Sequence, residues 1–218
     1  MSAKSPGSKA WLEGAYDLTS PDDNRAYYQE FAKAYDAEFA DALGYCYPRI
    51  IAEAYLAAAK PDDTPVADIG CGTGLVAEAL PPDTAIDGFD ISPRMLDAAR
   101  AKGLYRTLYE ADITGDLAGF GAKYGAVLSA GTFTHGHLGP EPFKGLLALA
   151  RPGGLFVIGV NQAHFDALGF GAVLNRMVAE GLISEPTLKE TRIYDQDGHA
   201  HASDLALVLT YHRLPEGR

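Results

Sequence analysis

Cysteine is scarce in this chain: only two of the 218 residues are cysteines, Cys46 and Cys71. Small secreted domains that rely on disulfides carry far more of it. Cys71 also stands inside a glycine-rich segment, where a disulfide would hinder the close approach of a ligand to the backbone. The scarcity therefore favours a reducing, cytoplasmic location.

Basic residues are also few. The sequence has 18 Lys and Arg against 29 Asp and Glu, a formal net charge of -11. Proteins that bind nucleic acid neutralise phosphates with clustered Lys and Arg. The charge balance therefore argues against DNA or RNA as a partner or substrate.

Long apolar runs are missing as well. No segment approaches the roughly 18 apolar residues of a membrane-spanning helix. The opening residues, MSAKSPGSKA, lack the apolar region of a signal peptide. We therefore expect no membrane partner and no cleaved leader. The mixture of 47% hydrophobic and 22% charged residues is typical of one soluble globular domain.

Several common catalytic signatures are absent. There is no Gly-x-Ser-x-Gly elbow of hydrolases and no Gly-Lys-Ser/Thr of phosphate-binding loops. Leu75 replaces the third glycine of a dinucleotide fingerprint, which disfavours an NAD-dependent oxidoreductase. The pairs His135/His137 and His199/His201 lack a surrounding framework of metal ligands, so no metal is expected.

The chain divides into a tail and one domain. Residues 1–19 lack periodicity and are expected to form a flexible tail. Residues 20–60 are expected to form a helical cap with helices at about 20–42 and 48–59. From 64–218 short apolar runs alternate with helical segments, which indicates βαβ units. The expected parallel strands lie near 65–69, 85–90, 105–109, 124–130 and 154–160.

The end of the chain predicts a different arrangement. ETRIYD (190–195) and SDLALVLTYHR (203–213) have the composition of strands, and Asp197-Gly198 between them suits a tight hairpin turn. An antiparallel pair should close the sheet. Ser92-Pro93 after the second strand is typical of a helix start, because serine caps and proline fits the first turn.

The strongest functional pattern is VADIGCGTG, residues 66–74. A buried strand turns through three glycines into a helix, at the sheet edge where doubly wound folds bind ligands. Asp68 before the loop would repel a pyrophosphate and attract an ammonium group. Asp90 ends the next strand, about 20 residues after Gly70. In nucleotide-binding folds a carboxylate at this distance from the first glycine binds ribose hydroxyls. A nucleoside with an amino group and no phosphate fits this pattern.

VADIGCGTG resembles motif I of the class I S-adenosylmethionine-dependent methyltransferases. The similarity covers about 64–160 and continues through ADIT, YGAVLSAGTFTH and RPGGLFVIGV. It implies an α/β, doubly wound Rossmann-like sheet of seven strands in the order 3-2-1-4-5-7-6, with the last strand antiparallel. It also implies S-adenosylmethionine as the cofactor and S-adenosylhomocysteine as the product.

The resemblance assigns a role to each matching position. Asp68 and the glycine loop hold the methionine part, and Asp90 at the end of the second strand holds the ribose. The residues that follow the second and third strands hold the adenine. Tyr28 and Tyr35 of the cap reach the methionine end. The implied cofactor-binding residues are Tyr28, Tyr35, Asp68, Gly70, Cys71, Gly72, Thr73, Gly74, Asp90, Ile91, Met95, Asp112, Ile113, Ser129 and Ala130. YQEFAKAYD (28–36) and SAGTFTHGH (129–137) further resemble the Williams-Beuren syndrome critical-region methyltransferase-like group.

The acceptor half of the site is less defined. His135 and His137 follow the fourth strand and are the candidate catalytic bases, although histidines there equally suit hydrogen bonds to loop backbone. We expect an enzyme that methylates a small molecule held between the cap and the loops after the fourth and fifth strands. The alternative is a non-catalytic module that binds S-adenosylmethionine or S-adenosylhomocysteine and regulates a partner. The sequence does not specify an oligomeric state.

Overall fold

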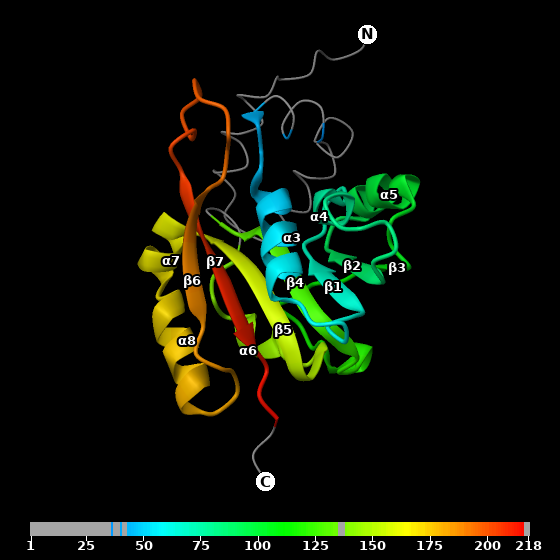
Figure 1. The fold of residues 1–218 in the computed structure, drawn as a ribbon, viewed down its shortest axis with the longest axis vertical. Coiled ribbons are helices and arrows are strands. Elements are labelled where there is room, and N and C mark those ends of the chain that lie inside the picture. Colours follow the sequence, from blue (N-terminus) through cyan, green and yellow to red (C-terminus); the bar gives the residue numbers. More distant parts are fainter. Residues whose placement is uncertain (1–35, 37–39, 41–42, 135–137, 216–218) are drawn as a thin grey trace.

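The fold is a mixed seven-stranded sheet with helices on both faces (Figure 1). The computed structural model describes residues 36, 40, 43–134 and 138–215. The strands are β1 (Val66–Ile69), β2 (Ile86–Asp90), β3 (Thr107–Glu110), β4 (Tyr124–Phe133), β5 (Ala150–Asn161), β6 (Thr187–Arg192) and β7 (Leu205–His212). The helices are α3 (Tyr47–Ala58), α4 (Leu75–Glu78), α5 (Pro93–Lys102), α6 (Phe143–Leu146), α7 (Gln162–Leu168) and α8 (Phe170–Ala179), with a 3-10 turn η2 (Ala118–Phe120).

The strand order is β3-β2-β1-β4-β5-β7-β6, as predicted. Strands β1 to β5 pair in parallel, whereas β7 is antiparallel to both β5 and β6. The carboxyl ends of the parallel strands therefore meet at one edge. No helix in the described part of the chain is long and apolar enough to cross a membrane.

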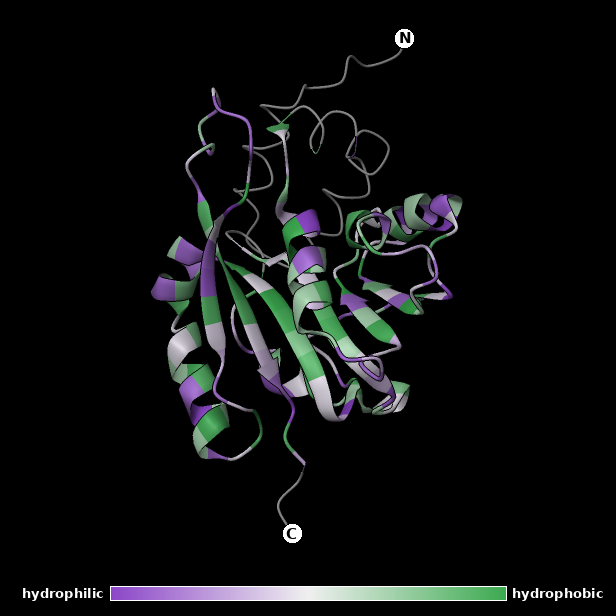
Figure 2. Ribbon diagram, in the orientation of Figure 1, coloured by the Kyte–Doolittle hydropathy of each residue, from purple (hydrophilic) through white to green (hydrophobic). Residues whose placement is uncertain are grey.

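Two apolar clusters cover the two faces of the sheet. Along β1, Val66 belongs to the cluster that α3 and α4 complete, while Ala67 and Ile69 belong to the cluster that α6 and α8 complete. The alternation arises because successive side chains of a strand point to opposite faces of the sheet. Asp68 therefore faces the α3 and α4 side. Figure 2 shows the apolar residues gathered on the central strands and polar residues on the outer strands and helix surfaces.

Helix α5 begins as the sequence predicts. The Ser92 hydroxyl accepts a hydrogen bond from the Met95 backbone N–H at 3.4 Å, and Pro93 takes the first helical position. The side chains of Met95, Leu96 and Ala99 are buried. The helix thus starts directly after β2 and places its first turn beside the carboxyl edge of the sheet.

The β6–β7 connection differs from the predicted tight turn. The two strands pair as expected, but their ladder ends at Arg192 opposite Leu205, so 193–204 form a long loop. The reason is a competing partner: Tyr194 forms a β-bridge with Tyr45, and the Asp195 N–H donates to the Gly44 carbonyl at 2.8 Å. The chain cannot turn at Gly198 in two residues while it also pairs with the segment before α3.

Strand β5 begins earlier than predicted. Ala150 pairs with Tyr124, and the register then shifts so that Leu155 pairs with Ala126. Pro152-Gly153-Gly154 therefore lies within the strand as an irregular stretch. Proline and glycine are found in strands at such irregularities, because the ladder hydrogen bonds are already interrupted there.

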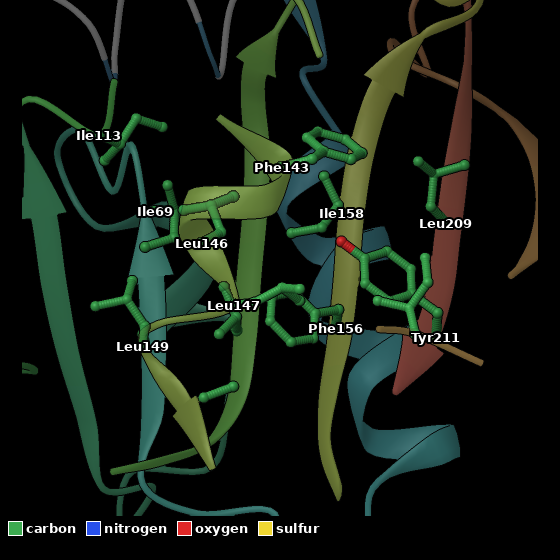
Figure 3. Close-up of a cluster of buried hydrophobic side chains, with 14 of the residues drawn as sticks. Ile69, Ile113, Phe143, Leu146, Leu147, Leu149, Phe156, Ile158, Leu209 and Tyr211 are labelled. Carbon is green, nitrogen blue, oxygen red and sulfur yellow. The ribbon is translucent and has the colours of Figure 1, made fainter. Parts of the chain in front are cut away.

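Tyr211 carries a buried hydroxyl with no hydrogen-bond partner (Figure 3). Its ring stacks on Phe156 with centroids 4.9 Å apart. Burying a hydroxyl without a partner costs about 1–3 kcal/mol. We expect Tyr211→Phe to raise the free energy of unfolding by about 1 kcal/mol, measured by urea denaturation. Tyr124→Phe is the control and should lower stability, because the Tyr124 hydroxyl donates to Asp87 at 2.8 Å. A loss of stability in Tyr211→Phe would contradict the prediction.

Candidate cofactor and methyl-transfer site

The loop between β1 and α4 is built from glycines with left-handed backbone angles. Gly70, Gly72 and Gly74 have φ of +64°, +53° and +97°. The Gly74 N–H donates to the Cys71 carbonyl at 2.9 Å, which closes the turn before Leu75 starts α4. The loop thus presents backbone rather than side chains at the carboxyl edge, as the sequence predicts.

Asp90, at the end of β2, is held in place by backbone donors. Its Oδ2 accepts from the Gly72 N–H and its Oδ1 from the Ser92 N–H, both at 2.8 Å. Desolvation raises the pKa of Asp90, and these hydrogen bonds counteract the rise. Each carboxylate oxygen keeps further acceptor capacity. The carboxylate is therefore fixed beside the glycine loop and can still accept from hydroxyl groups of a ligand.

Asp68 is fully buried beneath the loop. Its Oδ2 accepts a hydrogen bond from the Tyr105 hydroxyl at 2.7 Å, whereas its Oδ1 has no partner. Burial raises the pKa of Asp68 to about 7, although the Tyr105 hydrogen bond opposes the rise. A buried carboxylate oxygen without a donor is costly. The site therefore has an unmet acceptor that a cationic or donor group would satisfy.

Tyr105 is a residue that the sequence did not reveal. It precedes β3, and its ring lies against Gly88, which pairs with Asp68 on the neighbouring strand. A Cβ at Gly88 would lie 3.1 Å from the Tyr105 ring and 2.8 Å from the Cys71 Sγ. The glycine leaves room for both side chains. A glycine inside the short second strand was the one available signal that a large side chain approaches there.

The residues assigned to adenine lie next to Asp90. The Ala111 N–H donates to the Asp90 carbonyl at 3.0 Å, which brings the segment after β3 to the end of β2. Ile113 is buried, while Asp112 is exposed and its Oδ1 accepts from the Thr114 N–H at 2.9 Å. On the other side of Asp90, Ile91 is half-buried and Met95 is buried. Figure 3 places Ile113 near Ile69 at the same edge.

Thr73 of the loop contacts the segment before residue 43. Its hydroxyl donates to Asp36 Oδ1 at 2.5 Å, and the Lys102 ammonium lies 2.6 Å from Asp36 Oδ2. Lys102 also pairs with Glu78 at 3.0 Å. The Asp36 carboxylate therefore lies between the glycine loop and the end of α5. Tyr28, Tyr35, His135 and His137 lie outside the described residues.

Ser129 supports the loop from β4. Its buried hydroxyl donates to the Ile69 carbonyl at 2.8 Å, and the Thr132 hydroxyl donates to the same carbonyl at 3.0 Å. The β4–β5 register shifts after Ser129 and resumes at Phe133, so Ala130 lies in an irregular stretch. The two hydroxyls fix the end of β1 where the glycine loop begins.

Among the described residues no group of three or more His, Cys, Asp and Glu forms a candidate metal site.

Comparison with known proteins identifies the domain. Residues 66–154, from β1 into β5, match the methyltransferase domain family. The chain therefore carries a methyltransferase domain. Human methyltransferase-like protein 27 is 29% identical to this methyltransferase over 83% of this chain and 78% of its own length.

Solved structures share the fold of this methyltransferase. A TehB-like S-adenosylmethionine-dependent methyltransferase from Corynebacterium glutamicum is 19% identical with a TM-score of 0.56, over 86% of this chain and 98% of that one. A methyltransferase in a complex with the Haloferax volcanii Trm112 methyltransferase activator is 17% identical with a TM-score of 0.56, over 87% and 98% of the two chains. At these identities the likeness concerns the fold.

Proposed function

We propose that this methyltransferase transfers the methyl group of S-adenosylmethionine to a small molecule. The observation that carries the cofactor half is the buried Asp68 oxygen without a partner below a glycine loop, next to the fixed carboxylate of Asp90. These are the groups that an amino acid joined to a nucleoside would satisfy. The formal net charge of -11 supports a small acceptor over a nucleic acid.

The cofactor-binding roles extend to both sides of the loop. We infer that Asp68 attracts the ammonium of the methionine part and that Asp90 accepts from the ribose hydroxyls. The adenine would lie between the side chains after β2 and those after β3, among them Ile91, Met95 and Ile113. Tyr28 and Tyr35 remain predicted contacts of the methionine end.

The chemistry requires little of the protein beyond alignment. When bound, S-adenosylmethionine supplies a sulfonium whose methyl group is displaced in line by the acceptor atom. The protein contributes by orienting the acceptor and excluding water. If the acceptor is a hydroxyl or an ammonium, its proton must also be removed. His135 and His137, after β4, remain the predicted bases for that step.

Three further features belong to the proposal. We infer that residues 20–60 and the loops after β4 and β5 enclose the acceptor, within one domain that spans 20–218. Asp36, bound to Thr73 and Lys102, supports contact between the N-terminal segment and the cofactor loop. Both cysteines are free and buried, which supports a reducing, cytoplasmic location.

Substitution of Asp90 tests the cofactor site. We expect Asp90→Ala to weaken S-adenosylmethionine binding by about 1.5–3 kcal/mol, measured by calorimetry, because charge-assisted hydrogen bonds to the ribose are lost. Asp97→Ala is the matched control, since Asp97 is an exposed carboxylate on α5 that pairs with Arg100. Unchanged affinity in Asp90→Ala would refute the ribose assignment.

The same proteins separate the enzyme from a binding module. With a pool of metabolites below the size of proteins and nucleic acids, the wild-type chain should convert S-adenosylmethionine to S-adenosylhomocysteine, and Asp90→Ala should be slower. Cofactor binding without S-adenosylhomocysteine formation would favour the non-catalytic regulatory module.

A further inference from the structure

The long β6–β7 loop lies at the same edge of the sheet as the cofactor site. Strand β6 runs parallel to β5, so residues 193–204 follow its carboxyl end. Figure 1 shows this loop extending past the sheet next to the segment before α3. The Tyr45–Tyr194 bridge and the bond from the Cys46 N–H to the Ile193 carbonyl (3.1 Å) join the two segments.

Tyr45 connects this loop to the end of β4. A Cβ at Gly131 would lie 2.5 Å from the Tyr45 hydroxyl oxygen, so the hydroxyl sits directly against that glycine. Gly131 belongs to the irregular stretch of β4 that follows Ser129 and Ala130. Burial raises the pKa of Tyr45, so its hydroxyl stays neutral. Tyr45 therefore stands beside the β4 residues assigned to the cofactor.

Two more rings continue from Tyr45 into the loop. The Tyr194 ring lies 5.7 Å from the Tyr45 ring, centroid to centroid, at an interplanar angle of 44°. The His199 imidazole meets Tyr194 edge to face, with centroids 4.8 Å apart. The three rings thus form a row, here called the aromatic row, that starts at the end of β4 and ends at His199. Tyr194 is only 2% exposed, so the row is an internal stack of rings with polar groups at its two ends.

His199 has two ring nitrogens that are buried and have no partner, whereas His212, at the far end of β7, has one. In the same loop, His201 Nδ1 lies 2.9 Å from Asp204 Oδ2, and behind β5 the His164 Nε2 lies 3.0 Å from the Leu138 carbonyl. A buried imidazole that makes no hydrogen bond carries a desolvation cost of about 1–3 kcal/mol. Such a group gains from any ligand that bonds to it.

We propose that His199 recognises the methyl acceptor, and that the acceptor is a neutral planar molecule with a hydroxyl group, of the phenol class. This inference rests on the proposed function, because it assigns a residue to the acceptor half of that site. A neutral imidazole has one donor and one acceptor, which match the hydroxyl of a phenol. A planar ring would continue the aromatic row beyond His199. The exposed Asp195 in the same loop opposes an anionic acceptor, whereas Asp197 is paired with Arg192 at 2.7 Å.

The test is histidine NMR on the full chain saturated with S-adenosylhomocysteine. Phenol is the probe, and toluene and benzoate are controls that lack the hydroxyl or carry a negative charge. We expect phenol to shift the His199 ring resonance saturably and the two controls to leave it in place. His199→Gln assigns the resonance and should weaken phenol binding about tenfold or more. His201→Gln is the matched control in the same loop and should bind phenol as the wild type does.

A second variant guards against a loss of structure. His199→Phe keeps a ring against Tyr194 and removes both nitrogens, so it should bind S-adenosylhomocysteine normally and phenol weakly. Equal phenol binding in the wild type and His199→Phe, or no saturable shift, would overturn the assignment of His199. Failure of the wild type to bind S-adenosylhomocysteine would instead refute the proposed function. The two failures are therefore distinguishable in one set of samples.

Discussion

Asp68→Asn is expected to stabilise the ligand-free protein at about pH 8, by up to about 4 kcal/mol, while it weakens binding of S-adenosylmethionine. The cause is the buried carboxylate, one oxygen of which has no donor. An amide removes the buried charge and still offers an acceptor to the Tyr105 hydroxyl. The same amide removes the charge that attracts an ammonium. Stability and cofactor affinity should therefore change in opposite directions.

The sign follows from the two protonation equilibria of Asp68. Its pKa is about 7 in the folded chain, against about 3.9 in an unfolded one. Between these values the folded state binds more protons, so the contribution of Asp68 to stability is full below about pH 4 and is lost as pH rises through about 7. The gain in Asp68→Asn should therefore be near zero at about pH 4 and reach its maximum above about pH 7. Cofactor affinity of the wild type should fall as pH drops below about 7, because the carboxylate becomes protonated.

Urea unfolding of the ligand-free proteins at about pH 4 and pH 8 measures the effect. Asp87→Asn is the control, because Asp87 is equally buried but paired with Arg106 at 2.8 Å and Tyr124 at 2.8 Å. That variant should lose stability at about pH 8, because Arg106 and Tyr124 lose the negatively charged carboxylate that they bind. A destabilised Asp68→Asn at about pH 8, or the same gain at both pH values, would show that the buried charge is not the cause.

Gly70→Ala is expected to lower the free energy of unfolding by about 2–4 kcal/mol. Two costs combine at this position. The backbone has φ +64°, which side chains with a Cβ rarely adopt, and the new Cβ would lie 2.1 Å from Thr132 Oγ1. Thr132 cannot easily move, because its hydroxyl donates to the Ile69 carbonyl at 3.0 Å and its Oγ1 lies 2.9 Å from the Ser129 Oγ. The loop must shift, and cofactor binding should weaken with it.

Gly72→Ala separates the two costs. Gly72 has φ +53° and open space within 4 Å of an added Cβ, so only the backbone penalty of about 1 kcal/mol should apply. The double variant Gly70→Ala/Thr132→Ala should recover part of the loss relative to the sum of the single variants, because the clash is removed. Thermal or urea unfolding of the wild type, the single variants Gly70→Ala, Gly72→Ala and Thr132→Ala, and the double variant supplies the comparison. If Gly70→Ala and Gly72→Ala cost the same, the contact with Thr132 plays no role.

The strand, the glycine loop and the helix start at this edge of the sheet were predictable because contiguous residues encode them. VADIGCGTG contains the strand, the turn and the start of the helix, and Ser92-Pro93 marks the next helix by its own capping chemistry. The contacts that complete the site join distant residues instead. Tyr105 reaches Asp68, and Asp36 reaches Thr73, through side chains whose sequence neighbourhood gives no sign of either partner.

The β6–β7 connection shows the same limit. Asp197-Gly198 has the chemistry of a tight turn, and Gly198 does adopt φ +96°. Yet the neighbouring Tyr194 and Asp195 pair with the segment before α3, more than a hundred residues earlier. Local turn propensity predicts the angle at one residue. The length of the loop depends on pairing with the segment before α3, which only the folded chain brings near.

The position of β7 has a consequence for synthesis of the chain on the ribosome. The last strand pairs on one side with β5 and on the other with β6. While the nascent chain lacks 205–212, the buried strand β5 has one open edge, and β6 has no strand beside it in the sheet. Open edges of apolar strands invite pairing with other chains. Emerging polypeptides of this methyltransferase are thus most exposed to misassembly in the interval between the synthesis of β6 and that of β7, when a chaperone would be of greatest use.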